Sequence, residues 1–152
     1  MKIKEYDVEL TSQRPKLVVK ETYEYGSKKE TINSPDEIAR FCRSAMRLHM
    51  KAEEYVYILG MNTKGKVLGV CEVAKGDSNF CYFPIKSLLV RLLLMGASSA
   101  ILVHNHPSAE VTPSKADSEV TETIKKACKT VGIELLDHVI VGGRRYYSFN
   151  EN

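Results

Sequence analysis

One run of residues limits the fold more than any other. Ser99 to Val103 reads Ser-Ala-Ile-Leu-Val, and the chain passes from it directly into His104. A short apolar run of this kind is typical of a strand that is buried on both faces at the centre of a sheet. Such a strand needs neighbouring strands on its two sides and helices over both faces. The run therefore predicts a layered fold in which His104 stands at one end of the central strand.

A helix start is marked at Ser34. A serine at the N-cap, Pro35 at the first helical position and Glu37 three residues after the serine form a capping box. Apolar residues then follow at helical spacing and predict one buried face, formed by Ile38, Phe41, Ala45 and Leu48. The other expected elements are strands at 55–59, 67–73, 133–141 and 146–149, turns at 26–29, 62–66 and 75–79, and a helix from 84 to 96.

A further helix is expected after the histidines. Thr112 suits its N-cap, Pro113 suits its first position, and Gly132 ends it. Its spacing of apolar residues predicts a buried stripe, which consists of Val120, Ile124, Ala127 and Val131.

Strands and helices thus interleave along the chain. This order predicts an α/β (α+β) fold, a three-layer sandwich in which helices flank a mixed β-sheet. The length of 152 residues fits one domain with a substantial core. We expect residues 1–33 to be an extended lead-in with strand-like segments, and residues 34–152 to be the folded domain.

Charge and hydropathy argue against several classes of protein. The net charge is +3, and the basic residues occur in pairs, whereas a dedicated DNA-binding domain usually carries a clustered basic face. The most apolar run, 88–97, is interrupted by Arg91 and is too short to cross a bilayer. The first residues lack the apolar core of a signal peptide. We therefore expect a cytoplasmic protein without a membrane partner.

The four cysteines, Cys42, Cys71, Cys81 and Cys128, are scattered among apolar neighbours. None forms a C-x-x-C pair, so a cysteine zinc site is not indicated. Reduced thiols are favoured, and a Cys71–Cys81 disulfide across a hairpin is the alternative, with a prior of roughly one in ten.

Two histidines one residue apart, His104 and His106, follow the central strand. That spacing lets both imidazoles reach one ion, and neutral imidazole is a good zinc ligand. Asp117 lies in the first turns of the next helix and shares a helix face with Ser114. A lone H-x-H pair is a weak signal, because many such pairs lie in surface loops or are hydrogen-bonded pairs. If the helix packs across the strand end, however, His104, His106 and Asp117 give three ligands and leave a fourth position for water, as in catalytic zinc sites.

The segment His104-Asn105-His106-Pro107-Ser108, followed by Thr112-Pro113-Ser114-Lys115-Ala116-Asp117, resembles the motif of the JAB1/MPN/Mov34 metalloenzymes, the JAMM proteases. Within that superfamily the chain is most similar to the bacterial RadC proteins, over residues 34–149. The resemblance implies a JAB/MPN fold similar to cytidine deaminases, a Zn²⁺ cofactor and a peptide or protein substrate. Longer relatives carry an N-terminal helix-hairpin-helix domain, for which residues 1–33 are too short and too strand-like.

The resemblance also implies a general base and an oxyanion donor. The family places a glutamate at the start of an early strand, and Glu54 stands in that position. The neighbouring Glu53 would point to the opposite face of the strand and is expected to be solvated. Glu54 would take a proton from the attacking water. Ser114 would donate a hydrogen bond to the developing oxyanion, with helix capping as its alternative or additional role.

Some positions depart from the family pattern or have an open role. Ile85 and Lys86 stand where relatives usually carry Arg-Glu, and Ala109 stands where they tend to have glycine. Asp137 and His138 belong to the resemblance, and His138 is expected either to contact the site or to be a hydrogen-bonded core histidine.

The leading hypothesis is a JAMM-type zinc hydrolase that cleaves a peptide or isopeptide bond. The alternative is a DNA-repair-associated module, as the RadC label suggests, that binds nucleic acid or a protein partner and in which the metal site is secondary. The complete set of Glu54, Ser114 and three ligands favours the hydrolase, and the lack of a basic stripe disfavours the alternative. A homodimer stays open.

Overall fold

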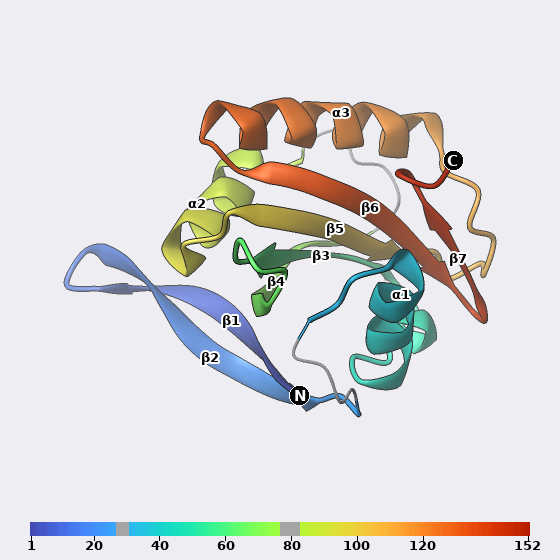
Figure 1. The fold of residues 1–152 in the computed structure, drawn as a ribbon, viewed down its shortest axis with the longest axis horizontal. Coiled ribbons are helices and arrows are strands. Elements are labelled where there is room, and N and C mark those ends of the chain that lie inside the picture. Colours follow the sequence, from blue (N-terminus) through green and yellow to red (C-terminus); the bar gives the residue numbers. More distant parts are fainter. Residues whose placement is uncertain (27–30, 77–82) are drawn as a thin grey trace.

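A computed structural model describes residues 1–26, 31–76 and 83–152. These residues form one mixed sheet of seven strands in the order β2-β1-β4-β3-β5-β6-β7, with three α-helices packed against it (Figure 1). The elements are β1 (Lys2–Thr11), β2 (Arg14–Glu24), α1 (Pro35–Ser44), the 3₁₀ helix η1 (Leu48–Met50), β3 (Glu54–Met61), β4 (Val67–Gly76), α2 (Ile85–Met95), β5 (Ser99–Asn105), α3 (Lys115–Thr130), β6 (Glu134–Gly142) and β7 (Arg145–Ser148).

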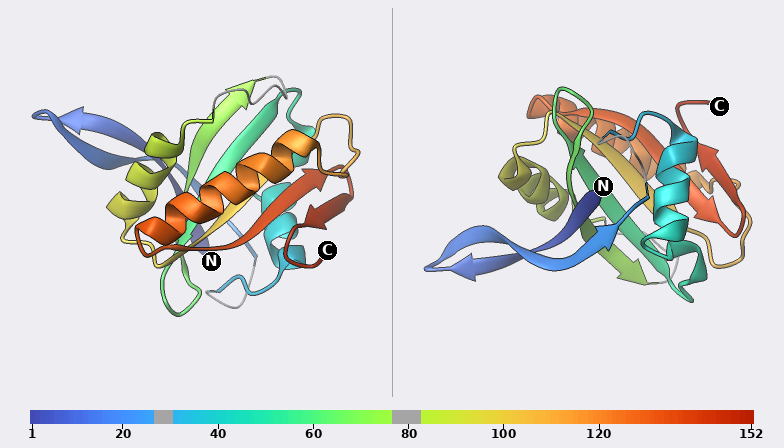
Figure 2. Two further views of the ribbon diagram at one scale, coloured as in Figure 1. Left: turned by 90° about the horizontal axis from the view of Figure 1, so that it is seen from above. Right: turned by 60° about the horizontal axis from the view of Figure 1, so that its bottom comes forward.

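Helices cover both faces of the sheet. α1 packs on one face, α2 and α3 pack on the other, and a separate apolar core fills each interface (Figures 1 and 2). Phe41 of α1 lies in the first core, and Leu92 of α2 and Ile124 of α3 lie in the second, all without exposed surface. The predicted three-layer α+β sandwich is confirmed.

The strand β5 lies at the centre of these layers. It pairs antiparallel with β3 on one side and parallel with β6 on the other. Ile101 and Val103 belong to the core under α1, whereas Ala100 and Leu102 belong to the core under α2 and α3. Because both faces of β5 are buried, the run of apolar residues without alternation is explained.

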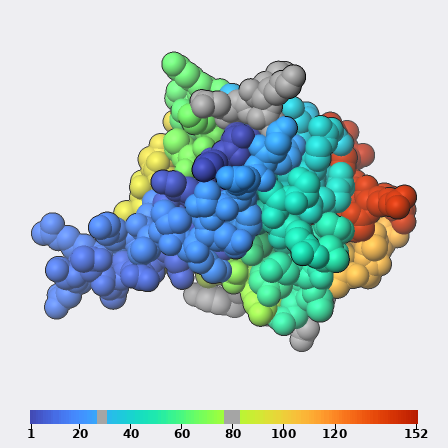
Figure 3. Space-filling view, turned by 90° about the horizontal axis from the view of Figure 1, so that it is seen from below, coloured from blue at the N-terminus to red at the C-terminus, as the bar shows by residue number. Residues whose placement is uncertain are grey.

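The N-terminal segment forms a long β-hairpin at one edge of the sheet. Ser12 and Gln13 have φ angles of 50° and 65°, which a two-residue hairpin turn with the right-handed twist requires. β1 also pairs parallel with β4 through Glu5 and Val70, so the hairpin extends the sheet, while its tip projects beyond the rest of the molecule (Figure 3). The sequence-based boundary between residues 33 and 34 stays a prediction.

A buried carboxylate anchors this hairpin. Glu5 is only 1% exposed, and it accepts a hydrogen bond from the Tyr23 hydroxyl of the paired strand. The Lys20 ammonium lies 3.0 Å from Glu5 Oε1. A charge is buried at large cost unless it has such partners, so the three side chains fix how β1 and β2 meet.

The start of α1 agrees with the prediction, with one difference. Ser34 is the N-cap and accepts a hydrogen bond from the Glu37 backbone N–H at 3.2 Å. The Glu37 carboxylate accepts from the backbone N–H of Asn33, at 2.8 Å, and not from that of Ser34. Both hydrogen bonds therefore cap the start of the helix. The bond to the Glu37 carboxylate comes from Asn33, one residue before the donor that a standard capping box would use.

The predicted start of α3 is wrong by two residues. The N-cap is Ser114 and not Thr112, because Ser114 and Asp117 form a capping box in which each side chain binds the other's backbone N–H. Thr112 instead donates its hydroxyl to the Glu110 carboxylate, at 2.9 Å, which keeps this segment out of the helix. Asp117 is thus fixed in the first turn of α3, with its carboxylate turned toward the helix start.

The predicted buried stripe of α3 is only partly right. Ile124 is buried, but Val120 and Ala127 are half-buried and Val131 is exposed. The stripe was chosen from apolar residues alone, whereas two polar residues lie on the face that meets the sheet. That face consists of Asp117, Thr121, Ile124 and Cys128.

Three other expectations involve residues beyond the described ranges. The turns at 26–29 and 75–79 and the Cys71–Cys81 alternative each include such residues. Cys42, Cys71 and Cys128 are buried free thiols. Among the helices of residues 1–26, 31–76 and 83–152, none has both the length and the apolar character that a bilayer span needs.

Candidate metal centre

The alternation of side chains along each strand brings the candidate residues to one face of the sheet. Ala100 and Leu102 of β5 point toward α3, so His104, two residues further, points the same way. In β3, Val56 faces the same core and pairs with His104, which places Glu54 on that face as well. The period of two residues thus directs His104 and Glu54 toward the start of α3.

Three potential ligands converge there. His104 and His106 place their Nε2 atoms 2.9 Å apart, and Asp117 places Oδ1 3.3 Å from His104 Nε2 and Oδ2 3.6 Å from His106 Nε2. Nitrogen and oxygen ligand atoms of the three residues all lie within 4.8 Å of one another. In the part of the chain that the structure describes, no other group of three histidine, cysteine or acidic residues has this arrangement.

Each ligand is held from behind by a second contact. His106 Nδ1 lies 2.7 Å from the backbone carbonyl of Glu110. A carbonyl can only accept, so His106 carries its hydrogen on Nδ1 and turns an Nε2 lone pair toward the cluster. Asp117 Oδ2 accepts hydrogen bonds from the backbone N–H and the hydroxyl of Ser114, both at 2.7 Å. These contacts therefore hold the His106 ring and the Asp117 carboxylate with their acceptor atoms turned toward the centre.

Burial and hydrogen bonding set the protonation states of the ligands. Burial lowers the pKa of His104 to about 4, so its ring is neutral at physiological pH. The pKa of His106 is raised, chiefly because the Asp117 carboxylate can accept a hydrogen bond from the protonated form of the ring. Burial by itself would raise the pKa of Asp117, but His106, His104 and Ser114 together hold that pKa well below its usual range. The centre thus contains a carboxylate next to a neutral buried imidazole.

The chemistry of this donor set fits a divalent metal ion. Two imidazole nitrogens and one carboxylate oxygen form a three-ligand set used in metal hydrolases, with a further position left for water. The His106 lone pair and the acceptor-only Asp117 carboxylate meet in one small space, which favours a cation between them. His104, His106 and Asp117 would hold that ion.

Glu54 lies beside this cluster, as the sequence predicts. It lines a hollow of about 250 Å³ together with His106, Ser114 and Asp117. The neighbouring Glu53 is exposed and lies 3.5 Å from the Lys75 ammonium, outside the hollow. The structure therefore brings together all five residues singled out for the site and separates Glu53 from them.

Asn105 fixes the backbone on both sides of Glu54. Its Oδ1 accepts from the Tyr55 N–H at 2.8 Å, and its Nδ2 donates to the Glu53 carbonyl at 3.0 Å. Since Asn105 stands between the two histidines, the same residue links the strand that carries Glu54 to the strand that carries the ligands.

Sequence reasoning left the role of His138 open and did not consider Thr121. The structure shows His138 as a hydrogen-bonded core histidine that contacts a ligand: its Nε2 lies 2.7 Å from His104 Nδ1, and its Nδ1 lies 2.6 Å from Thr121 Oγ1. The spacing of four residues between Asp117 and Thr121 puts both on one helix face, and this was the available signal for Thr121.

Asp137 has a structural role at the end of the sheet. Its carboxylate accepts hydrogen bonds from the backbone N–H groups of His138 and Asn150 and from the Ser148 hydroxyl. These contacts tie β6 to the C-terminal turn after β7 and hold His138 in place.

The two departures from the family pattern lie in different surroundings. Ile85 packs half-buried against the core under α2, and Lys86 is exposed. Ala109 has a φ of 63°, a conformation that glycine adopts without strain and alanine adopts at a cost of about 1–2 kcal/mol. The loop after the histidines therefore carries backbone strain that a glycine would remove.

The same loop depends on a glycine in β6. A Cβ on Gly142 would lie 2.8 Å from the Ala109 carbonyl oxygen and 2.8 Å from Val111 Cγ1. The His106 N–H donates to the Val141 carbonyl at 3.0 Å, so the loop cannot move away from β6 without moving His106.

We expect Gly142→Ala to lower the free energy of unfolding by about 1–3 kcal/mol and to weaken the binding of a metal ion at the candidate centre. Denaturant unfolding and a zinc titration measure the two effects. Gly60→Ala is the matched control, because its Cβ would meet Met95 Sδ at 2.8 Å, away from the site. It should lose stability and keep its affinity for zinc. Equal zinc affinities in both variants would contradict this role of Gly142.

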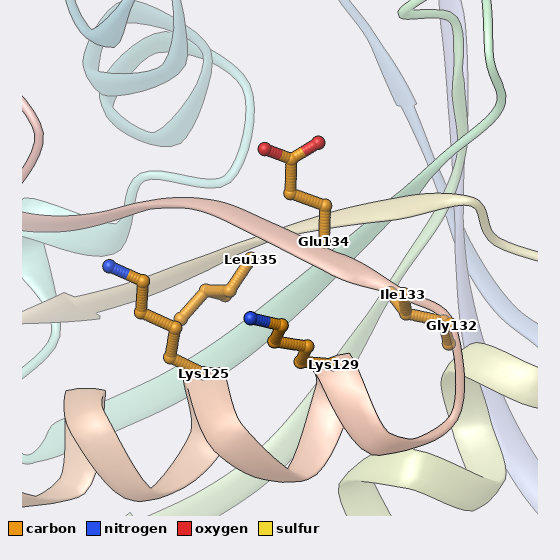
Figure 4. Close-up of a pocket in the computed structure, with 6 residues that line it drawn as sticks. All are labelled: Lys125, Lys129, Gly132, Ile133, Glu134 and Leu135. Carbon is orange, nitrogen blue, oxygen red and sulfur yellow. The ribbon is translucent and has the colours of Figure 1, made fainter.

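A second hollow, of about 390 Å³, lies at the other end of α3. Lys125 and Lys129 extend from the helix toward β6, and Ile133 and Leu135 line the same hollow (Figure 4). Its lining, which also includes Gly132 and Glu134, contains one carboxylate and no histidine or cysteine, so it does not offer a metal ligand set.

Comparison with known protein families matches residues 32–152 to the RadC-like JAB domain. A UPF0758 protein of Alkaliphilus metalliredigens is 37% identical over 120 residues, which cover 79% of this chain and 51% of the relative. A UPF0758 protein of Halalkalibacterium halodurans is 39% identical over 120 residues, with the same two coverages. A UPF0758 protein of Chlorobium phaeovibrioides is 38% identical over 106 residues, which cover 70% of this chain and 48% of the relative. The chain spans about half the length of these curated relatives.

Proposed function

The chain belongs to the RadC-like JAB domain family, and from this membership and the geometry of the site we propose that it is a zinc-dependent hydrolase that cleaves a peptide or isopeptide bond. The observation that carries the proposal is the convergence of His104, His106 and Asp117 within 4.8 Å, with Glu54 on the wall of the same hollow. Two imidazoles and one carboxylate are a usual ligand set for catalytic zinc.

His104, His106 and Asp117 would hold the zinc ion, which would supply a Lewis acid able to acidify water and to polarise the substrate carbonyl. The Glu54 carboxylate is the general base in this proposal: it accepts a proton from the attacking water and returns it to the leaving amine. Its place on the wall of the hollow, beside His106, supports that role.

Ser114 is proposed as the donor to the oxyanion. In the structure its hydroxyl donates to Asp117 Oδ2 and accepts from the Asp117 N–H, so it also caps α3. To stabilise an oxyanion, the hydroxyl hydrogen would turn from Asp117 toward the substrate, a change that needs only rotation about the Cβ–Oγ bond. The two roles are compatible because the capping bond uses the lone pair of Oγ.

The substrate class is proposed on the same grounds. A peptide or protein chain fits a hydrolase in which the base and two of the ligands, His106 and Asp117, line a hollow open to solvent. Nucleic-acid binding has less support, because the net charge is only +3. A homodimer stays a prediction from the sequence.

Two measurements on chelator-free protein test the proposal. Elemental analysis should find close to one zinc per chain, and digestion of a peptide and isopeptide library should give zinc-dependent products detected by mass spectrometry. The variant Lys125→Ala/Lys129→Ala, changed only at the distant hollow, is the control and should match the wild type in both. Protein that takes up no zinc would overturn the proposal.

A further inference from the structure

A chain of three hydrogen bonds connects two of the zinc ligands through the protein interior. It runs from His104 Nδ1 to His138 Nε2, at 2.7 Å, and from His138 Nδ1 to Thr121 Oγ1, at 2.6 Å. It ends where the Thr121 hydroxyl meets the backbone carbonyl of Asp117, at 2.6 Å. The chain links β5, β6 and α3, which lie side by side (Figure 1), and its three side chains are at least 93% buried.

The direction of every bond in this chain follows from its last member. A carbonyl oxygen has no hydrogen, so the single hydroxyl hydrogen of Thr121 is given to Asp117. Thr121 Oγ1 can then only accept from His138, which places the ring hydrogen of His138 on Nδ1. His138 Nε2 is left with a lone pair and can only accept from His104. The hydrogen of His104 is thereby placed on Nδ1.

A stacking contact keeps the middle ring of the chain in place. His138 lies parallel to Phe149, with ring centroids 4.8 Å apart and an angle of 5° between the planes. The backbone N–H of Phe149 also donates to the His138 carbonyl, at 3.0 Å. A 180° flip of the ring would put carbon atoms where the two nitrogens lie and would break both hydrogen bonds.

We infer that Thr121 and His138 are positioning residues that set the tautomer of His104, so that its Nε2 lone pair faces His106 and Asp117. The inference rests on the proposed zinc site. In His106 one backbone carbonyl places the ring hydrogen on Nδ1, whereas in His104 two side chains place it there. Partners of this kind behind a metal ligand typically change metal affinity by about 10–100-fold when they are removed.

The variant Thr121→Val tests the inference because it keeps the shape of threonine and removes the hydroxyl. We expect its zinc dissociation constant to rise about 10–100-fold in competition with a chromophoric chelator. Thr121→Ser restores the hydroxyl and should restore the wild-type constant. Thr123→Val is the matched control: Thr123 makes the same bond to the carbonyl four residues back, at 2.8 Å to Glu119, but on the exposed face of α3. It should bind zinc like the wild type.

Long-range ¹H–¹⁵N correlation spectra of the zinc-free protein give a readout that does not need metal. His104 and His138 should both carry hydrogen on Nδ1 in the wild type, and His104 should show a mixture of tautomers in Thr121→Val. Thr121→Ala removes the same hydroxyl if valine disturbs the packing.

Either of two results would overturn the inference. The first is a His104 with its hydrogen on Nε2 in the zinc-free wild type, and the second is a Thr121→Val protein that binds zinc as tightly as the wild type. If the wild type itself took up no zinc, the proposed function would fail, while the spectra would still decide the tautomer of His104.

Discussion

Glu54→Gln should lower the rate of hydrolysis by roughly 10²–10⁴-fold, which is the contribution that a positioned general base makes. Glutamine has nearly the same shape as glutamate and cannot accept the proton of the attacking water. The zinc content should not change, because His104, His106 and Asp117 form the ligand group and Glu54 only lines the hollow beside them. Rates on the cleaved library peptides and elemental analysis of the same sample measure the two quantities.

The neighbouring residue provides the control for this prediction. Glu53→Gln changes the same side chain one position earlier, on the opposite face of the strand, where Glu53 is exposed and lies near Lys75. It should keep the wild-type rate. A Glu54→Gln variant that turns over normally would remove Glu54 from the mechanism. An equal loss in both variants would indicate a general effect of negative charge near the hollow.

The sequence was sufficient for the layers of the fold and for the group of candidate site residues. A buried central strand leads to His104, and alternation along β3 and β5 places Glu54 and His104 on the same face. The layers and the shared face follow from local periodicity. Glu54 and Ser114 were singled out by the resemblance to the JAMM motif, which depends on the types and spacing of a few residues. Neither route needs knowledge of long-range contacts.

Two features could not be predicted in this way. The start of α3 was placed at Thr112 because a threonine followed by proline is a strong local signal, but the pairing of Ser114 with Asp117 outweighs it. The role of Thr121 depends on β6 lying beside α3, since its partner His138 is 17 residues away in the chain. The first error comes from a local signal that a stronger pair of residues outweighs. The second arises because polar residues on a buried helix face are missed when the face is defined by apolar residues alone.

The proposed zinc site should also control the stability of the protein. Zinc that binds the folded chain alone stabilises it by about 4 kcal/mol when free zinc is 1,000 times the dissociation constant. For a domain of this size, each 1 kcal/mol raises the midpoint of thermal unfolding by about 2–4 °C. We therefore expect zinc to raise that midpoint by about 8–16 °C. Magnesium should not reproduce the shift, because it prefers six oxygen ligands.

Asp117→Asn should abolish most of this zinc-dependent shift. The amide removes the negative charge that faces His104 and His106, while an oxygen remains to accept a hydrogen bond at the start of α3. Asp36→Asn is the matched control, because Asp36 is also a first-turn aspartate, at the exposed start of α1, where it pairs with Arg40. It should keep the full shift. Thermal unfolding of the wild type and the two variants, with and without zinc, measures the shift. A full shift in Asp117→Asn would show that the stabilising zinc binds elsewhere. The reason is that a histidine pair without its carboxylate lacks the third ligand of the proposed site.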